Sequence, residues 1–226
     1  MVIGKAEAAE AGLPNGLVLG PKRTRVTFSA GKPTAIESVP AGKDAVGTFT
    51  MIDVESKQDA IEWVKQLPRN GDEEIEVREG GCPGGVPSIS LSKAGRANVD
   101  ATRFVVMLKA NPQEEAGRIP EEARLRAMVI TNEASVKAGV MLAGEGLQPS
   151  SRGTRVKFAG GKATVVDGPF AEAKELVAGF WLIQARSTEE AIEWVKEYPF
   201  PFLDAEVEVR EALPPSRTAL RRDKLG

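Results

Sequence analysis

Residues 167–175 carry the residue types best suited to chemistry in this sequence. They read DGPFAEAKE and follow a strand-like run that ends at Val166. A carboxylate at a strand end could bind a substrate or act as a general base, so Asp167 is the candidate catalytic residue. Pairing with Lys174 or Arg210 would lower the pKa of Asp167, which suits an anchor better than a base. The alternative is structural, since Asp-Gly-Pro makes a turn whose carboxylate accepts backbone N–H groups.

Three further residues, Glu145, Phe170 and Trp181, complete the candidate ligand-binding set with Lys174 and Arg210. Glu145 stands between Gly144 and Gly146, and glycines let a backbone approach a ligand closely. The alternative is a pair of turn glycines after a helix. Phe170 and Trp181 could line an apolar pocket, although such aromatics also serve as plain core.

Composition limits the available chemistry. The 226 residues include no histidine, which removes histidine-based triads and the common zinc sites. The single cysteine, Cys82, lies in a glycine-rich loop and can form no intrachain disulfide. We therefore expect no cofactor and no metal, and we expect a cytoplasmic location.

Charge and hydropathy exclude two classes of partner. The 30 Lys and Arg against 32 Asp and Glu leave a net charge of -2, without the basic face of a nucleic-acid binder. The basic cluster at residues 217–224 is either a solvated terminus or a docking patch. No apolar run approaches the roughly 18 residues of a membrane span, and the start lacks a signal-peptide core. A small molecule is the expected partner.

Internal similarity predicts a tandem duplication. The hexapeptide AIEWVK occurs at residues 60–65 and again at 191–196. Residues 24–28 resemble 154–158, and residues 76–79 recur at 208–211, always about 130 positions apart. The expected divisions are a truncated first copy at 1–84, a linker at 85–100, a complete copy at 101–213 and a basic tail at 214–226.

The second copy reads as a complete α+β unit. The pattern predicts the order strand, helix, hairpin, strand, helix, strand. The expected strands are 103–109, 179–185 and 205–211, with a hairpin at 154–166 that turns at Gly160 and Gly161. One helix opens at Pro120 after a polar loop at 111–118 and is followed by a turn at 144–149, and the other helix is capped by Ser187. This is a ferredoxin-like order with an added hairpin between its helices. The open apolar face of such a sheet requires a second sheet, which the first copy would supply.

The first copy departs from this order at its start. Residues 1–11 are expected to supply only the end of a first helix, so no strand matches 103–109. The linker residues Ile89 and Leu91 could fold back into that gap, or the linker could remain extended. A sequence recorded from a downstream start codon would explain the truncation equally well.

With the second copy laid out, the chain resembles the YCII-related family, specifically its DGPF branch. The residues that carry the resemblance are 166–175, then GFWLI at 179–183, Glu190 with Ala191, Trp194, and VEVR at 207–210. The resemblance implies a dimeric α+β barrel, here two ferredoxin-like units packed sheet to sheet within one chain. The wider superfamily includes monooxygenases and isomerases, so no single activity is implied. Some relatives are thought to use a His-Asp pair, of which only Asp167 is present here.

These observations favour small-molecule binding in a barrel pocket near Asp167, with catalysis left open. The alternative is a non-enzymatic interaction or regulatory module that uses the barrel surface or free edge strands, with homodimerisation as one form. The motif occurs once, because residues 36–42 of the first copy read IESVPAG where the second copy has VDGPFAE. One copy is therefore expected to hold the site while the other supplies packing.

Overall fold

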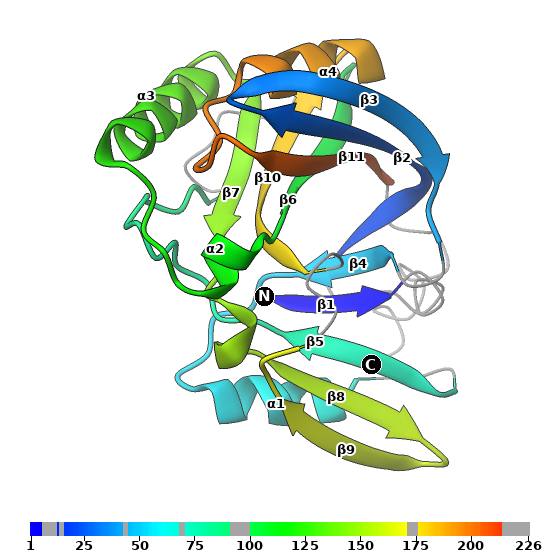
Figure 1. Ribbon diagram of the computed structural model, residues 1–226. Coiled ribbons are helices and arrows are strands. Elements are labelled where there is room, and N and C mark those ends of the chain that lie inside the picture. The colour runs from blue at the N-terminus through cyan, green and yellow to red at the C-terminus, as the bar shows by residue number, and fades with distance from the viewer. Residues whose placement is uncertain are drawn as a thin grey trace.

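The computed structural model describes residues 1–5, 13, 16–42, 45–67, 71–90, 100–170 and 176–213 (Figure 1). The described strands form one antiparallel sheet of eleven strands, joined by few helices. The predicted α+β class is confirmed. None of the described helices is both long and apolar enough to cross a membrane.

The second half of the chain has the predicted elements in the predicted order, with two additions. A short helix at residues 112–115 and a strand at residues 141–146 were not predicted, and the turn expected at residues 144–149 is wrong because residues 141–146 pair with residues 179–183. Its central strands lie in the order β7-β10-β6-β11. The elements are β6 (Thr102–Lys109), α2 (Pro112–Glu115), α3 (Glu122–Lys137), β7 (Met141–Gly146), β8 (Thr154–Ala159), β9 (Lys162–Asp167), β10 (Val177–Ala185), α4 (Thr188–Glu197) and β11 (Ala205–Leu213). The hairpin β8–β9 turns at Gly160 and Gly161, both with positive φ, as the Gly-Gly pair predicts.

Local capping explains where two of these helices begin. Ser187 caps α4 by accepting a hydrogen bond from the Glu190 backbone N–H at 3.3 Å, as predicted. Helix α2 was not predicted, since this segment was expected to be a polar loop. Asn111 and Glu114 form a reciprocal capping box around it, and Pro112 occupies its first turn.

The first half contains a strand that the sequence did not predict. Its elements are β1 (Val2–Lys5), β2 (Leu17–Ser29), β3 (Lys32–Pro40), β4 (Val46–Thr50), α1 (Lys57–Lys65) and β5 (Glu73–Val77). Strand β1 lies between β4 and β5, as β6 lies between β10 and β11. The expectation that this half lacks its first strand was therefore wrong. Four residues are too short to show a periodic pattern, and their partners lie more than 40 positions away.

The linker does not fill a gap in the first half. Ile89 instead pairs with Gly144 of β7 through two backbone hydrogen bonds of 2.9 Å. The other linker residue of interest, Leu91, lies outside the described residues.

The two halves meet along two strand seams with matching registers. In one, β2 pairs with β11 so that Val26 faces Val207. In the other, β8 pairs with β5 so that Val156 faces Ile75. Matching ion pairs accompany them: Arg25 to Glu206 at 3.0 Å and Arg155 to Glu74 at 3.6 Å. Residues 25 and 155, and residues 206 and 74, are equivalent in the repeat described above.

The core consists of three apolar clusters. One lies beneath α3 and α4, and a second packs α1 against β5 and β8 (Figure 1). The third is shared between the halves and joins Met1, Ile3 and Phe49 to Met107 and Phe180. The sheet that surrounds it is not closed, because the ladder ends at β7 and β9. The predicted barrel is therefore not confirmed as a closed sheet.

Candidate functional site

Asp167 lies on the protein surface at the end of β9. Its side chain is 66% exposed and forms an ion pair with Lys57 of α1 at 3.2 Å. Its Oδ1 also accepts a hydrogen bond from the Thr154 hydroxyl at 2.6 Å. The Thr154 hydrogen bond and then the Lys57 ammonium lower the pKa of Asp167, so the carboxylate stays ionised. It contacts the first half of the chain through Lys57. The candidate counter-charge Lys174 lies outside the described residues.

Arg210 is a buried seam residue rather than a partner of Asp167. Its Nε donates to the Gly20 carbonyl at 2.8 Å, and its guanidinium also donates to the Val46 carbonyl. Its Nη1 lies 3.5 Å from a carboxylate oxygen of Glu208. Burial lowers the pKa of Arg210 while Glu208 opposes that shift. These contacts occupy the guanidinium with backbone of β2 and β4.

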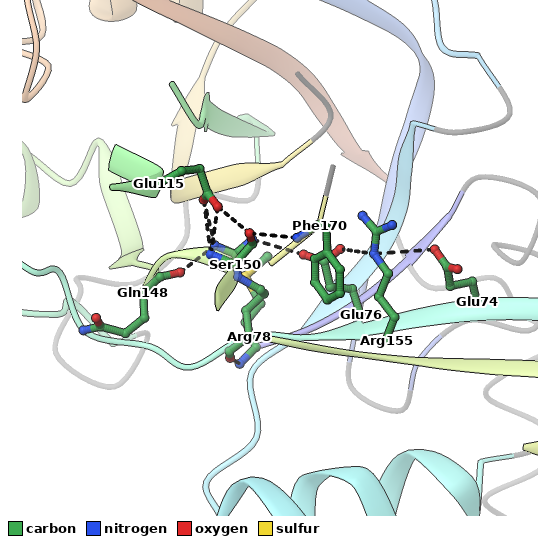
Figure 2. Close-up of polar contacts among 9 residues, drawn as sticks. Glu74, Glu76, Arg78, Glu115, Gln148, Ser150, Arg155 and Phe170 are labelled. Carbon is green, nitrogen blue, oxygen red and sulfur yellow. Dashed lines mark hydrogen bonds and ion pairs between the residues drawn. The ribbon is translucent and has the colours of Figure 1, made fainter. Parts of the chain in front are cut away.

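Phe170 packs against a charged side chain of the hairpin. The Arg155 guanidinium lies 4.1 Å from the centre of the Phe170 ring, a cation–π arrangement. The Phe170 backbone N–H donates to Ser150 Oγ at 3.3 Å (Figure 2). The DGPF turn is thus tied to the segment between β7 and β8.

A polar network extends from this turn toward α2 (Figure 2). The carboxylate of Glu115 accepts hydrogen bonds from the Ser150 backbone N–H at 3.0 Å and from the Ser150 hydroxyl. Arg78 donates to Glu76 at 3.1 Å and to the Gln148 carbonyl, and its Nη2 lies 3.8 Å from Glu115. The sequence interpretation named none of these residues as functional. Their positions depend on contacts between segments more than 30 residues apart.

A pocket opens in the second half of the chain, between the sheet, α2, α3 and the segment at residues 82–87. Its cavity volume is about 70 Å³, several times what one water molecule needs. Its apolar walls include Val86, Leu108, Met128, Leu147, Ala178 and Trp181. Its polar lining includes Arg78, Glu114, Glu115, Arg118, Asn132 and Glu145. Of the candidate residues, this pocket brings together Glu145 and Trp181. Asp167, Phe170 and Arg210 are not among the residues that line it.

Glu114 is the titratable group that distinguishes this pocket. Its Oε2 accepts a hydrogen bond from the Asn111 backbone N–H at 2.8 Å, within the capping box. Burial, helped by the neighbouring Glu115 carboxylate, raises the pKa of Glu114 from 4.5 to about 7 against the effect of that hydrogen bond. A carboxyl with this pKa can hold or release a proton near neutral pH. The missed signal in the sequence was the Asn-Pro-Gln-Glu capping pattern, which places Glu114 on a helix.

The glycines beside Glu145 accommodate protein rather than a ligand. A Cβ on Gly146 would lie 2.7 Å from the Cβ of Cys82, so a side chain there would clash with the covering segment. The Glu145 carboxylate accepts a hydrogen bond at 3.0 Å from the N–H of Gly81, the residue directly before that segment. Glu145 therefore lines the pocket and also holds the segment at residues 82–87 in place through Gly81. No group of three or more acidic or cysteine side chains that could hold a metal occurs within the described part of the chain.

Comparison with known proteins agrees with this architecture. A YCII-related domain is found at residues 102–213. It includes β6 to β11, and with them α2, Asp167 and most of the pocket lining. The chain is also 31% identical over 77 residues to an uncharacterized protein of Rhizobium meliloti (strain 1021). That match covers 34% of this chain and 62% of the relative, so it spans less than two thirds of the relative's length.

Proposed function

We propose that this YCII-related protein binds a small molecule in the pocket beside Glu114. The observation that carries this proposal is a half-buried carboxyl, with a pKa of about 7, in a pocket whose walls are largely apolar. Apolar walls with a few placed polar groups and a perturbed titratable residue are the usual features of a ligand site. Trp181 supplies part of the apolar wall and Glu145 supplies a fixed carboxylate.

The proposal separates the ligand from Asp167. That carboxylate is exposed and already paired with Thr154 and Lys57. Its role in the proposal is to connect the hairpin to α1, while the network through Ser150 and Glu115 supports the pocket wall. Asp167 would then act on binding only through this framework.

A thermal-shift screen of small neutral and charged fragments tests the proposal. Ala178→Phe adds a ring to the pocket wall, and Asp167→Ala is the matched control at the surface. A pocket ligand should stabilise wild type and Asp167→Ala and should fail to stabilise Ala178→Phe. Circular dichroism would establish that both variants are folded. A ligand effect lost in Asp167→Ala and kept in Ala178→Phe would move the site to the DGPF turn and refute the proposal.

We also propose that the chain is a tandem duplication of a ferredoxin-like unit of the DGPF branch, arranged as a pseudo-dimeric barrel. The equal registers and equivalent ion pairs of the two seams support the duplication. The apolar cluster shared between the halves supports the barrel arrangement. In this proposal the YCII-related domain at residues 102–213 is the complete copy and residues 1–84 are the divergent one.

A second candidate function is a protein-interaction module of the cytoplasm. The observation that favours it is the terminal strand β9, where Val165 and Val166 are 41% and 42% exposed. An unpaired apolar edge can add a strand from another chain. Light scattering of the purified chain over a range of concentrations tests self-association, and Val165→Lys should reduce it. A monomer at every concentration would count against homodimerisation through this edge.

A further inference from the structure

A buried hydrogen-bond chain determines which end of the Asn132 amide is the donor. An indole N–H can only donate, so Trp181 Nε1 donates to the Tyr198 hydroxyl oxygen at 3.0 Å. The Tyr198 hydroxyl then donates its own proton to Asn132 Oδ1 at 2.7 Å. Burial raises the pKa of Tyr198, so this hydroxyl keeps its proton. The side-chain carbonyl oxygen of Asn132 therefore already has a hydrogen-bond partner. Asn132 lines the pocket, and its NH₂ group is the part of the side chain that can donate to a ligand.

Glu114 supplies a second donor from a different helix. Its Oε2 accepts the Asn111 N–H, so the proton of the neutral carboxyl belongs on Oε1. Asn132 is on α3 and Glu114 is on α2, and both side chains line the same pocket. A protonated carboxyl in an apolar site can act as a hydrogen-bond donor near neutral pH.

The remaining charges around the pocket balance. The cations that line it are Arg78 and Arg118, and the other carboxylates are Glu115 and Glu145. Arg78 lies 3.8 Å from Glu115, and Glu145 accepts the Gly81 N–H. The Cys82 thiol is the other titratable group in the lining. With Glu114 protonated, the pocket offers neither excess positive nor excess negative charge to an ionic ligand.

We propose that the pocket binds a neutral ligand with an apolar body and a carbonyl group, whose oxygen accepts hydrogen bonds from the Asn132 amide and from the Glu114 carboxyl group. This ligand class rests on the proposed small-molecule function and specifies it. Buried donors that meet no acceptor are costly, so the site rejects a pure hydrocarbon of the same shape. The apolar walls provide the remaining affinity through burial of the ligand body.

Four fragments that share a phenyl ring test the proposal: acetophenone, ethylbenzene, 1-phenylethylammonium and benzoate. Dissociation constants are measured by calorimetry or NMR titration at about pH 6 and about pH 8, on either side of the Glu114 pKa of about 7. Acetophenone should bind best of the four. Its affinity should fall about tenfold from the lower to the higher pH, as the protonated fraction of Glu114 falls.

Two substitutions of Glu114 test whether binding needs a hydrogen-bond donor at this position and whether the pH dependence comes from the carboxyl group. Glu114→Gln keeps an N–H donor and can keep the capping box, so acetophenone binding should persist and lose its pH dependence. Glu114→Ala should weaken acetophenone binding about tenfold at pH 6, while the remaining Asn132 donor keeps acetophenone above ethylbenzene. Tyr198→Phe releases the Asn132 amide, and it should weaken acetophenone severalfold while leaving ethylbenzene unchanged.

The possible failures are distinguishable. If acetophenone binds no better than ethylbenzene, or equally at both pH values in wild type, the carbonyl assignment is overturned. Preferred binding of benzoate or 1-phenylethylammonium that Ala178→Phe abolishes would also overturn it, while leaving a small-molecule pocket in place. Failure of all four fragments to bind would contradict the proposed function itself.

Discussion

At the scale of single residues, two carboxyl groups show opposite effects of environment. Asp167 is exposed and has a hydroxyl and an ammonium as partners, which lower its pKa. Glu114 is half-buried in the wall of a largely apolar pocket, and the loss of water around its carboxyl raises its pKa to about 7. Its proximity to Glu115 raises it further, because two like charges are unfavourable. Asp167 belongs to the more conspicuous sequence motif, but Glu114 is the acid whose pKa lies near neutral pH.

Glu114→Gln should change how stability depends on pH. In the folded protein Glu114 holds its proton up to about pH 7, whereas in the unfolded chain it ionises above its ordinary pKa of 4.5. Wild type therefore loses stability as pH rises through this window, and the glutamine variant does not. The advantage of Glu114→Gln should grow by up to about 3 kcal/mol across it, measured by urea denaturation at several pH values.

Asp167→Asn is the matched control for that series. The folded pKa of Asp167 is lowered from 3.8, so its contribution is present above that value and is lost as pH falls. This variant should differ from wild type at neutral pH and converge with it in acid. A parallel pH profile for Glu114→Gln and wild type would show that the folded protein does not raise the pKa of Glu114.

At the scale of elements, the seams between strands are held by two different kinds of arginine. Arg210 is fully buried, and its guanidinium donates to carbonyls of β2 and β4. Arg25 lies on the same seam, but its side chain is 31% exposed where it pairs with Glu206. When a buried donor is removed, the backbone carbonyls that it served have no other partner. When one member of an exposed ion pair is removed, water solvates the charge that remains.

Arg210→Met should therefore destabilise the protein far more than Arg25→Met. The expected cost is about 2–4 kcal/mol for the buried residue, because the carbonyls lose their donor and Glu208 loses one of its ion-pair partners. The exposed pair should contribute less than about 1 kcal/mol. Urea denaturation of both variants measures the difference. Equal costs would mean that the Arg210 hydrogen bonds contribute little to the seam.

At the scale of the whole molecule, each half completes the other. Strand β11 of the YCII-related half pairs with β2, and its hairpin strand β8 pairs with β5. The central apolar cluster draws side chains from β1, β2 and β4 as well as from β6, β7 and β10. Neither half buries this surface alone.

Residues 100–213 expressed alone should form a homodimer. In that dimer β8 of one copy would pair with β11 of the other, because the two seams of the intact chain have the same register. Size-exclusion chromatography with light scattering measures the mass, and circular dichroism reports folding. A folded monomer would contradict the view that folding requires the seam and the shared cluster. An unfolded chain would show that a second copy of residues 100–213 cannot replace the first half, which would count against the duplication.

The sequence by itself determined the elements that local chemistry specifies. The hairpin at Gly160 and Gly161 and the Ser187 cap follow from backbone freedom and short-range hydrogen bonds. The helix at residues 60–65 follows from the identity of this hexapeptide with residues 191–196, which belong to the helix capped by Ser187. Of the pocket, the sequence anticipated Glu145 and Trp181, as residues able to approach or line a ligand.

Tertiary structure alone decided the rest. Strand β1 exists because β4 and β5 supply its hydrogen-bond partners, and four residues carry no pattern of their own. The pKa of Glu114 depends on desolvation by other segments, and the orientation of the Asn132 amide depends on Tyr198 and Trp181. Burial and hydrogen-bond direction are properties of neighbours distant in sequence, and no local pattern encodes them.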